Sequence, residues 1–310
     1  MEEILKAVDR KLIETELTQN HFVRKTNNGN NEIYIIDHKN APNTLLEIGR
    51  LREISFRDAG GGTGKSLDLD EYDYSEHPYQ QLIVWNPFDK EIVGGYRYIH
   101  CKDAGFNKHG EPNLATSEMF TFSEDFLTNY FPYTIELGRS FVQPIYQPTV
   151  DIRKGMYSLD NIWDGLGALL VDNPYLKYYF GKITMYPRFN IVARDLILYF
   201  LRKYFADTEE LVKPKAAIEL HTDLIKLQNT LYGSNYKDDY KILVQEVRRH
   251  NENLPPLVNA YMNLSATMKY FGTAINHGFG AVEESAIIIA LDDIYDIKKD
   301  RHLSTYKRKQ

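Results

Sequence analysis

The chain has 310 residues, of which 43% are hydrophobic and 26% charged, and this composition excludes an intrinsically disordered polymer. Its formal net charge of −6 argues against a general nucleic-acid coat, because such proteins bind phosphates through an excess of Lys and Arg. The single cysteine, Cys101, excludes an internal disulfide and a thiolate zinc cluster, so we expect a reducing compartment and no metal site.

The first half of the chain alternates amphipathic helices with short apolar strands. Apolar residues three to four apart indicate helices, and continuous apolar runs bounded by turn residues indicate strands. In chain order, the predicted elements are a helix over 1–20, a turn over 25–32, a strand over 33–36, a helix over 45–54 that ends at the glycines 60–62, a hairpin of strands over 81–85 and 92–99, and a strand over 133–142.

The second half continues this alternation around a charged block. The predicted elements are a helix over 161–170, a strand over 182–186, an apolar helix over 191–205, a helical insertion over 207–253, a helix over 261–271, a strand over 286–291 and a polar tail over 296–310. This order predicts an α/β fold with a mixed sheet. We therefore divide the chain into a core with an N-terminal helix (1–206), the insertion (207–253) and a C-terminal helix and strand that complete the core (254–310).

Membrane insertion is not expected from the apolar runs. The first residues contain no apolar signal region, and the runs 196–201 and 286–291 are far shorter than the roughly 18 residues that a membrane span needs. We expect a cytoplasmic protein, with peripheral contact to the inner face of a membrane at most.

Residues 59–66, AGGGTGKS, satisfy a relaxed phosphate-loop pattern, and Asp292 and Asp293 imitate a magnesium-binding end of a strand. The mechanism of that loop needs an apolar strand before it and a helix after it, so that backbone amides face the phosphates. A charged helix over 50–57 precedes the loop instead, and the acidic segment 67–73 follows it. We interpret residues 59–66 as a flexible glycine-rich loop rather than part of an ATPase.

Charged residues beside apolar elements form the candidate site. The groups are Arg52 with Phe56, Asp70 with Asp73, Arg97 on a strand, and Glu136 with Arg139 in the segment ELGRSF. Each group alone is more often part of a solvated surface. A carboxylate and a guanidinium inside an apolar strand, however, would be costly unless paired, so we expect a buried charge network.

Five ordered motifs carry a resemblance to a known family: RLREISF, LDLDEYD, VGGYRYI, IELGRSFVQPIY and IWDGLGALLVDNPYLKYYFG. Together they resemble the N-acyltransferases that make amino-acid lipids such as ornithine and glycine lipids, also called hemolysin-like proteins. That family belongs to the GNAT (GCN5-related N-acetyltransferase) superfamily and is similar in its first half to acyl-homoserine lactone synthases. The resemblance covers about residues 45–205 and resumes at 254–264 and 278–291. The glycines 60–62 and the block 207–253 depart from shorter family members.

The resemblance implies a GNAT-like fold, a mixed and mainly antiparallel sheet flanked by helices, with a helical insertion. It also implies roles for residues at the matching positions. Arg97, Glu136 and Arg139 are carried over as catalytic residues. Arg52, Phe56, Asp70, Asp73 and Trp163 are carried over as substrate-binding residues.

The donor side of the site is implied in the same way. Acyl transfer from a thioester to an amine needs a slot for a pantetheine arm, which the superfamily places beside the strand of Glu136. Gly138 could host a bulge that opens this edge. We expect Phe141, Val142 and Gln143 to offer backbone groups to the arm and Arg153, Lys154 and Gly155 to hold its phosphate. Trp163, Tyr175, Tyr178, Tyr179 and Phe180 would border the acyl chain, although core packing explains such aromatic residues equally well.

The implied reaction is transfer of a long-chain, 3-hydroxylated fatty acyl group from acyl carrier protein to the amine of a small amino acid, with Glu136 as general base. No cofactor would be bound permanently, coenzyme A is the alternative donor, and no nucleic acid is involved. An acidic carrier protein would dock on Arg153, Lys154, Lys177 and Lys182. The alternatives are a coenzyme A-dependent N-acetyltransferase, an acyl-homoserine lactone synthase and a non-catalytic lipid-binding protein.

Overall fold

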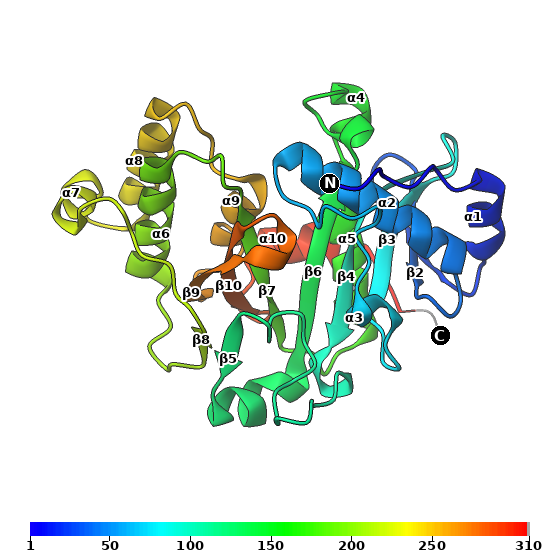
Figure 1. The fold of residues 1–310 in the computed structure, drawn as a ribbon, viewed down its shortest axis with the longest axis horizontal. Helices are drawn as coiled ribbons and strands as arrows, with labels where there is room; N and C mark the ends of the chain where they lie inside the picture. The colour runs from blue at the N-terminus through cyan, green and yellow to red at the C-terminus, as the bar shows by residue number, and fades with distance from the viewer. Residues whose placement is uncertain (309–310) are drawn as a thin grey trace.

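One mixed sheet forms the centre of the computed structural model, which describes residues 1–308 (Figure 1). In spatial order its strands are β1 (Phe22–Lys25), β2 (Glu32–Ile36), β3 (Gln80–Asn86), β4 (Glu91–His100), β6 (Thr134–Val142), β7 (Tyr178–Met185), β10 (Val282–Ala290) and β9 (Lys269–Asn276). All neighbours are antiparallel except β6 and β7. The predicted mixed, mainly antiparallel sheet is confirmed.

Helices cover both faces of this sheet. The α-helices are α1 (Arg10–Glu16), α2 (Pro42–Ala59), α3 (Glu71–Tyr74), α4 (Ile152–Gly155), α5 (Ser158–Asp172), α6 (Ile191–Phe205), α7 (Leu224–Thr230), α8 (Tyr236–Arg249), α9 (Pro256–Met262) and α10 (Asp296–His302). A second, two-stranded sheet consists of β5 (Phe120–Phe122) and β8 (Val212–Pro214). No helix within residues 1–308 has the length and apolarity needed to cross a membrane.

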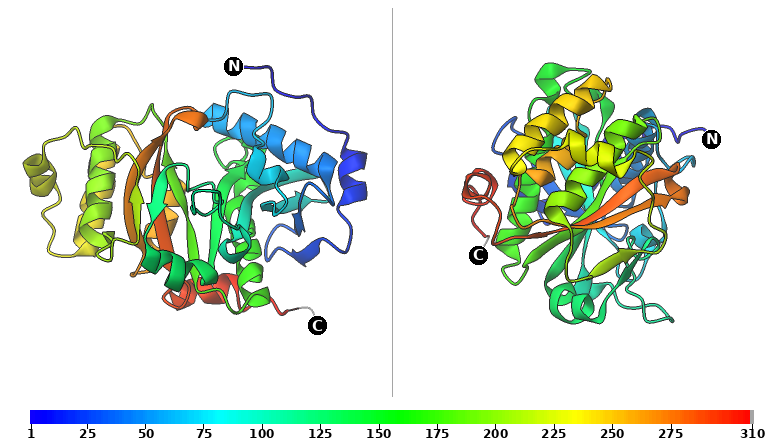
Figure 2. Two further views of the ribbon diagram at one scale, coloured as in Figure 1. Left: turned by 60° about the horizontal axis from the view of Figure 1, so that its bottom comes forward. Right: turned by 90° about the vertical axis from the view of Figure 1, so that its left-hand side faces the viewer.

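Side-chain alternation along the strands fixes which helix covers which face. In β3, Ile83 shares a core cluster with Ile48 of α2, whereas its neighbour Leu82 shares one with Leu166 of α5. Because successive side chains of a strand point to opposite faces, α2 and α5 lie on opposite sides of the sheet (Figure 2).

The charged block after α6 folds into helices at one end of the molecule, at the left in Figure 1. Asp239 of α8 joins the block to α6, because its Oδ2 accepts hydrogen bonds of 2.6 Å from both Lys203 Nζ and Tyr204 Oη. Its Oδ1 accepts another from the Gly233 amide, also 2.6 Å long. One buried carboxylate therefore holds α6, the turn before α8 and α8 together.

Several predicted elements at the N-terminus need correction. The helix predicted over 1–20 covers only Arg10–Glu16, because the Glu2 and Leu5 amides instead bond to the carbonyls of Gly64 and Ser66. The turn predicted over 25–32 is present and connects β1 to β2 in a hairpin, whose first strand was not predicted.

Two predictions near the C-terminus are also wrong. Residues 261–271 are not one helix, since α9 ends at Met262 and β9 begins at Lys269 as an edge strand of the sheet. The predicted polar tail contains α10, whose His302 is buried and bonds through Nδ1 to Asp164 Oδ1 at 2.8 Å. Because the sequence of α10 is mostly polar, its contact with Asp164 could not be predicted from an apolar pattern.

The glycine-rich loop after α2 closes around a carboxylate of the protein itself. Glu53 Oε2 accepts hydrogen bonds from the amide and hydroxyl of Thr63, and Glu53 Oε1 accepts one from the Gly64 amide, with lengths of 2.8–3.0 Å. Arg57 Nε bonds to the same carboxylate at 2.6 Å. The amides that a phosphate loop would turn toward a nucleotide are thus turned toward Glu53.

Replacing Glu53 by Ala should loosen this loop. The Thr63 and Gly64 amides would lose their acceptor, so we expect the free energy of unfolding in urea to fall by about 1–3 kcal/mol and trypsin to cut after Lys65 faster. Glu3→Ala, at an exposed position, is the matched control and should change neither measurement. Equal protease resistance of the two variants would show that Glu53 does not order the loop.

Candidate active site

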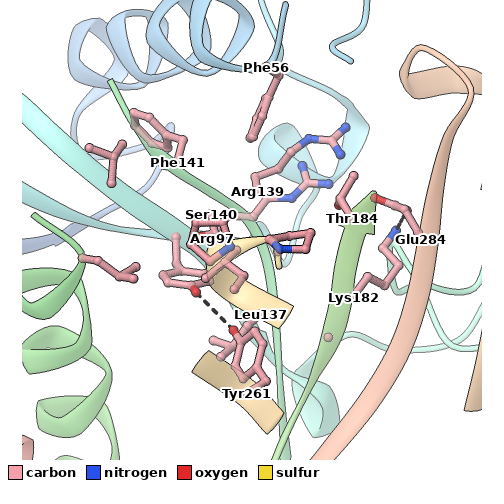
Figure 3. A pocket seen from close by; sticks show the side chains of 18 of the residues that line it. Phe56, Arg97, Leu137, Arg139, Ser140, Phe141, Lys182, Thr184, Tyr261 and Glu284 are labelled. Atoms are coloured by element: carbon pink, nitrogen blue, oxygen red, sulfur yellow. Dashed lines mark hydrogen bonds and ion pairs between the residues drawn. The ribbon is translucent and has the colours of Figure 1, made fainter. Parts of the chain in front are cut away.

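The parting of β6 and β7 creates the main cavity. The two parallel strands pair with each other from Thr134 and Tyr178 to Leu137 and Gly181. Beyond this point they separate from each other, and each continues beside its other neighbour, to Val142 and Met185. The opening leads into a cavity of about 650 Å³ (Figure 3).

The cavity is mainly apolar, with charged groups that come mostly from the sheet. Its apolar lining comes from α2, β6, β7, β10, the chain around α9 and the turn before β10, and includes Phe56, Leu137, Phe141, Val142, Tyr179, Phe180, Pro255, Pro256, Leu257, Tyr261, Phe279, Ile287 and Ile289. The charged lining residues are Arg97, Glu136, Arg139, Asp160, Lys182 and Glu284. This combination suits an apolar ligand with a reactive polar end.

A β-bulge brings Glu136 and Arg139 to the same cavity. Gly95 pairs with Phe141 and Arg97 pairs with Gly138, so two steps along β4 face three steps along β6. The extra residue lies just after Gly138, and the left-handed backbone falls on Arg139, with φ of 48°. The bulge predicted near Gly138 is therefore present. On a regular strand, residues three apart point to opposite faces, and the bulge instead lets both Glu136 and Arg139 face the cavity.

Glu136 lies buried on the cavity wall and is fixed by three donors. Its carboxylate accepts hydrogen bonds from the Tyr79 hydroxyl (3.0 Å), the Thr116 amide (3.2 Å) and the Thr116 hydroxyl (3.3 Å). Burial raises the pKa of Glu136 to about 7, although the Lys182 ammonium and these hydrogen bonds favour the charged form. A carboxyl group with a pKa near 7 can accept a proton under physiological conditions.

The arginines predicted for the site pair with aspartates rather than with Glu136. Arg97 Nη1 lies 2.7 Å from Asp70 Oδ1 and 3.2 Å from Asp73 Oδ2. Arg52 Nε lies 3.0 Å from Asp68 Oδ2.

Arg139 completes this network from β6. Its Nε lies 3.0 Å from Asp68 Oδ2, and its guanidinium stacks 4.0 Å from the centre of the Phe279 ring. Burial would raise the pKa of Asp68, but the charges of Arg139 and Arg52 hold it below its usual range. Three arginines and three aspartates thus form one buried charge network, as predicted from their apolar surroundings.

Some residues predicted to bind substrate lie away from the cavity wall. Arg52 and Asp73 are almost fully buried within the network and do not line the cavity, whereas Phe56 does. Trp163 lies on α5 against Tyr261 and His302, outside the cavity lining.

Asp68, the remaining acidic member of the network, was missed. The sequence LDLD places Asp68 two residues before Asp70, but this repeat does not show which of the two aspartates points inward.

The donor side matches the prediction in part. Phe141, Val142 and Gly155 line the cavity, whereas the Gln143 backbone amide, predicted to face the pantetheine arm, donates to the Val93 carbonyl at 3.0 Å. Tyr179 and Phe180 lie on the wall, but Tyr175 and Tyr178 do not.

The basic loop beside the cavity is capped by its own aspartate. Arg153 and Lys154 are exposed, and their amides donate to Asp151 Oδ1 at 2.9 and 3.1 Å. Lys154 Nζ also pairs with Asp89 at 2.7 Å. The first turn of α5, which follows this loop, borders the cavity through Ser158 and Leu159.

Two lysines predicted for a docking surface lie elsewhere. Lys182 lies in the cavity, where its Nζ is 2.7 Å from Glu284 Oε2. Lys177 precedes β7, at the opposite end of the strand from the opening. The strand direction therefore separates Lys177 from the opening, and Lys182 faces the cavity, where it pairs with Glu284.

Comparisons with known proteins agree with this geometry. An acetyltransferase (GNAT) domain profile matches residues 51–153. A glycine N(alpha)-acyltransferase of Bacteroides thetaiotaomicron is 56% identical over 306 residues, 99% of this chain and 91% of the relative. A protein of the same name from Phocaeicola vulgatus is 53% identical over 306 residues, 99% of this chain and 94% of the relative. No solved structure gives a significant match.

Replacing Arg52 by Met tests whether this residue is structural. The change leaves the buried carboxylates of Asp68 and Asp73 with less positive charge, so we expect the free energy of unfolding in urea to fall by about 3–5 kcal/mol. Arg249→Met, which breaks an exposed pair with Glu246, should cost about 1 kcal/mol or less. A stable Arg52→Met protein with a raised KM would instead support the substrate-binding role implied by the resemblance.

Proposed function

The chain belongs to the same family of GNAT acyltransferases as these two relatives and acts as an N-acyltransferase on an amino acid, and from this we propose that it attaches a long-chain, 3-hydroxylated fatty acyl group to the amine of glycine. Glycine is taken from the names of the relatives, and the acyl group from the resemblance of the motifs. The cavity between β6 and β7 supports the proposal most directly, because it joins an apolar volume of about 650 Å³ to a buried carboxylate, Glu136. The product, an N-acylated amino acid, is a membrane lipid precursor by its chemistry, which fits peripheral contact with a membrane.

The donor in this proposal is acyl carrier protein. The loop over residues 144–157 borders the cavity and exposes Val150, Ile152 and Met156 beside the cations Arg153 and Lys154. A surface that is apolar and basic is complementary to an acidic carrier protein whose pantetheine arm must enter the cavity. The unpaired edge of β6 at Phe141 and Val142 would receive the amides of that arm.

The proposed reaction uses Glu136 as the general base. Its carboxylate takes one proton from the acceptor ammonium, and the neutral amine then attacks the thioester carbon. The C–N bond forms, the C–S bond breaks, and the second amine proton passes to the leaving thiolate, which restores the thiol of the donor. The Tyr79 and Thr116 hydrogen bonds hold the carboxylate in one orientation throughout.

Product analysis tests this function. Purified protein would be incubated with 3-hydroxyacyl carrier protein, the matching acyl-coenzyme A or acetyl-coenzyme A, each with glycine, alanine, serine or ornithine. We expect N-acylglycine by mass spectrometry, formed at least about tenfold faster from the carrier protein, because steered docking raises association rates by 10-fold or more. Acetylglycine as the main product, or equal rates with ornithine, would overturn the proposal.

A charge reversal locates the docking surface in the same assay. The Arg153→Glu/Lys154→Glu variant should raise the KM for carrier protein at low salt, and added salt should shrink the difference because the affected charges are exposed. The KM for glycine should not change. An unaltered KM for carrier protein at low salt would remove this loop from the docking surface.

Replacing Glu136 by Gln tests the base. The amide keeps the shape, and its single oxygen can still accept from the Tyr79 and Thr116 hydroxyls while the Thr116 amide loses its acceptor, so we expect kcat to fall roughly 10²–10⁴-fold and the free energy of unfolding to fall by about 1–3 kcal/mol. Because the pKa of Glu136 is raised to about 7, the wild-type rate should increase as pH rises through about 7, where the carboxylate forms. The step near pH 7 should be absent in the variant, which a further rise in pH should partly rescue because more neutral amine is then present in solution. Near-normal turnover of Glu136→Gln at about pH 7–9 would exclude Glu136 as the base.

A further inference from the structure

A second buried ion pair lies in the cavity, apart from the arginine network. Lys182 of β7 and Glu284 of β10 meet at 2.7 Å between Nζ and Oε2, and their side chains are only 11% and 4% exposed. Asn276 donates a 3.1 Å hydrogen bond to the same carboxylate. Figure 3 shows the pair on strands across the cavity from Arg139.

The sheet register places Lys182 beside the proposed base. Glu136 pairs with Phe180 across β6 and β7, so their side chains share one face of the sheet. Lys182 is two residues beyond Phe180 and therefore lies on that face, immediately after the last paired residue, Gly181. Glu284 pairs with Thr184 and reaches Lys182 diagonally.

Lys182 differs from the arginines of the cavity in the number of carboxylates within ion-pair distance of its charged group. Arg97 and Arg139 each contact two aspartates of the network. For Lys182 Nζ, within the part of the chain that the structure describes, the acceptor is Glu284, and an ammonium has three hydrogens to donate. The lysine therefore has donors to offer to an anion that enters the cavity.

We infer that Lys182 binds the carboxylate of the amino-acid acceptor, with Glu284 holding the ammonium in place until the substrate arrives. This inference rests on the proposed function. The amine and carboxylate of glycine are separated by a single carbon, so the groups that bind them must lie side by side, as Glu136 and Lys182 do on one face. An acceptor bound in this way directs its amine toward Glu136 and the thioester.

A comparison of glycine with glycinamide, which has the amine but no carboxylate, tests the inference. Lys182→Met should lower kcat/KM for glycine about 10- to 100-fold, the usual effect of losing a charged hydrogen bond, and change that for glycinamide less than about threefold. The KM for the acyl donor should stay the same, and Lys182→Arg should recover part of the glycine activity. Lys215→Met, which breaks the exposed pair with Glu111, is the matched control and should behave as wild type.

Glu284→Gln gives a second test of opposite sign. Removing the competing carboxylate should lower the KM for glycine, whereas a purely structural pair would make both Lys182→Met and Glu284→Gln less active toward every acceptor. Equal losses of activity with glycine and glycinamide in Lys182→Met would overturn the inference. A raised KM for glycine in Glu284→Gln would also overturn it, and this test remains available if Lys182→Met does not fold. A wild-type protein that forms no N-acylglycine from any donor would instead refute the proposed function.

Discussion

Three of the buried or partly buried arginines meet in one charge network, and the cost of leaving any of these guanidinium groups without an anion holds the site in one arrangement. Arg52 belongs to α2, Arg97 to β4 and Arg139 to β6, and the carboxylates that neutralise them come from one short segment, Asp68 to Asp73. Moving any of these elements would separate buried opposite charges, which is far more costly than a shift in an apolar contact. The part of the cavity wall that Arg97 and Arg139 form is therefore held in place before a ligand enters.

The single parallel pair in the sheet decides where that cavity lies. An antiparallel neighbour could have followed β6 to its end, but β6 and β7 separate after Leu137 and Gly181 while each keeps its other neighbour. The bulge after Gly138 turns β6 away at the same level. Charged residues that would otherwise be sealed between strands consequently border a space that a substrate can occupy.

Much of the fold could be predicted from apolar periodicity, and the charge network could be predicted from the cost of burial. The segment ELGRSF was chosen because it places charged residues inside an apolar strand. The same criterion applies to Lys182 in YYFGKITM and to Glu284 in VEESAIII. The predicted strand began at Lys182 instead of Tyr178, so Lys182 was taken for a surface residue at a strand end. The helix predicted over 261–271 failed because apolar content without a clear period suits an edge strand as well. Which aspartate of LDLD points inward depends on the tertiary position of Arg52, which no local pattern contains.

The Glu53 carboxylate inside the glycine-rich loop also bears on what the amides of this loop can bind. Glu53 belongs to the same chain as the amides that it accepts from and lies only ten residues before Thr63, so its effective concentration at these amides is high. A nucleotide bound at these amides would have to displace an anion that cannot diffuse away, although the backbone shape itself remains compatible with anion binding. A sequence that matches a phosphate-loop pattern can therefore form a loop whose amides are satisfied by an acidic side chain of the preceding helix.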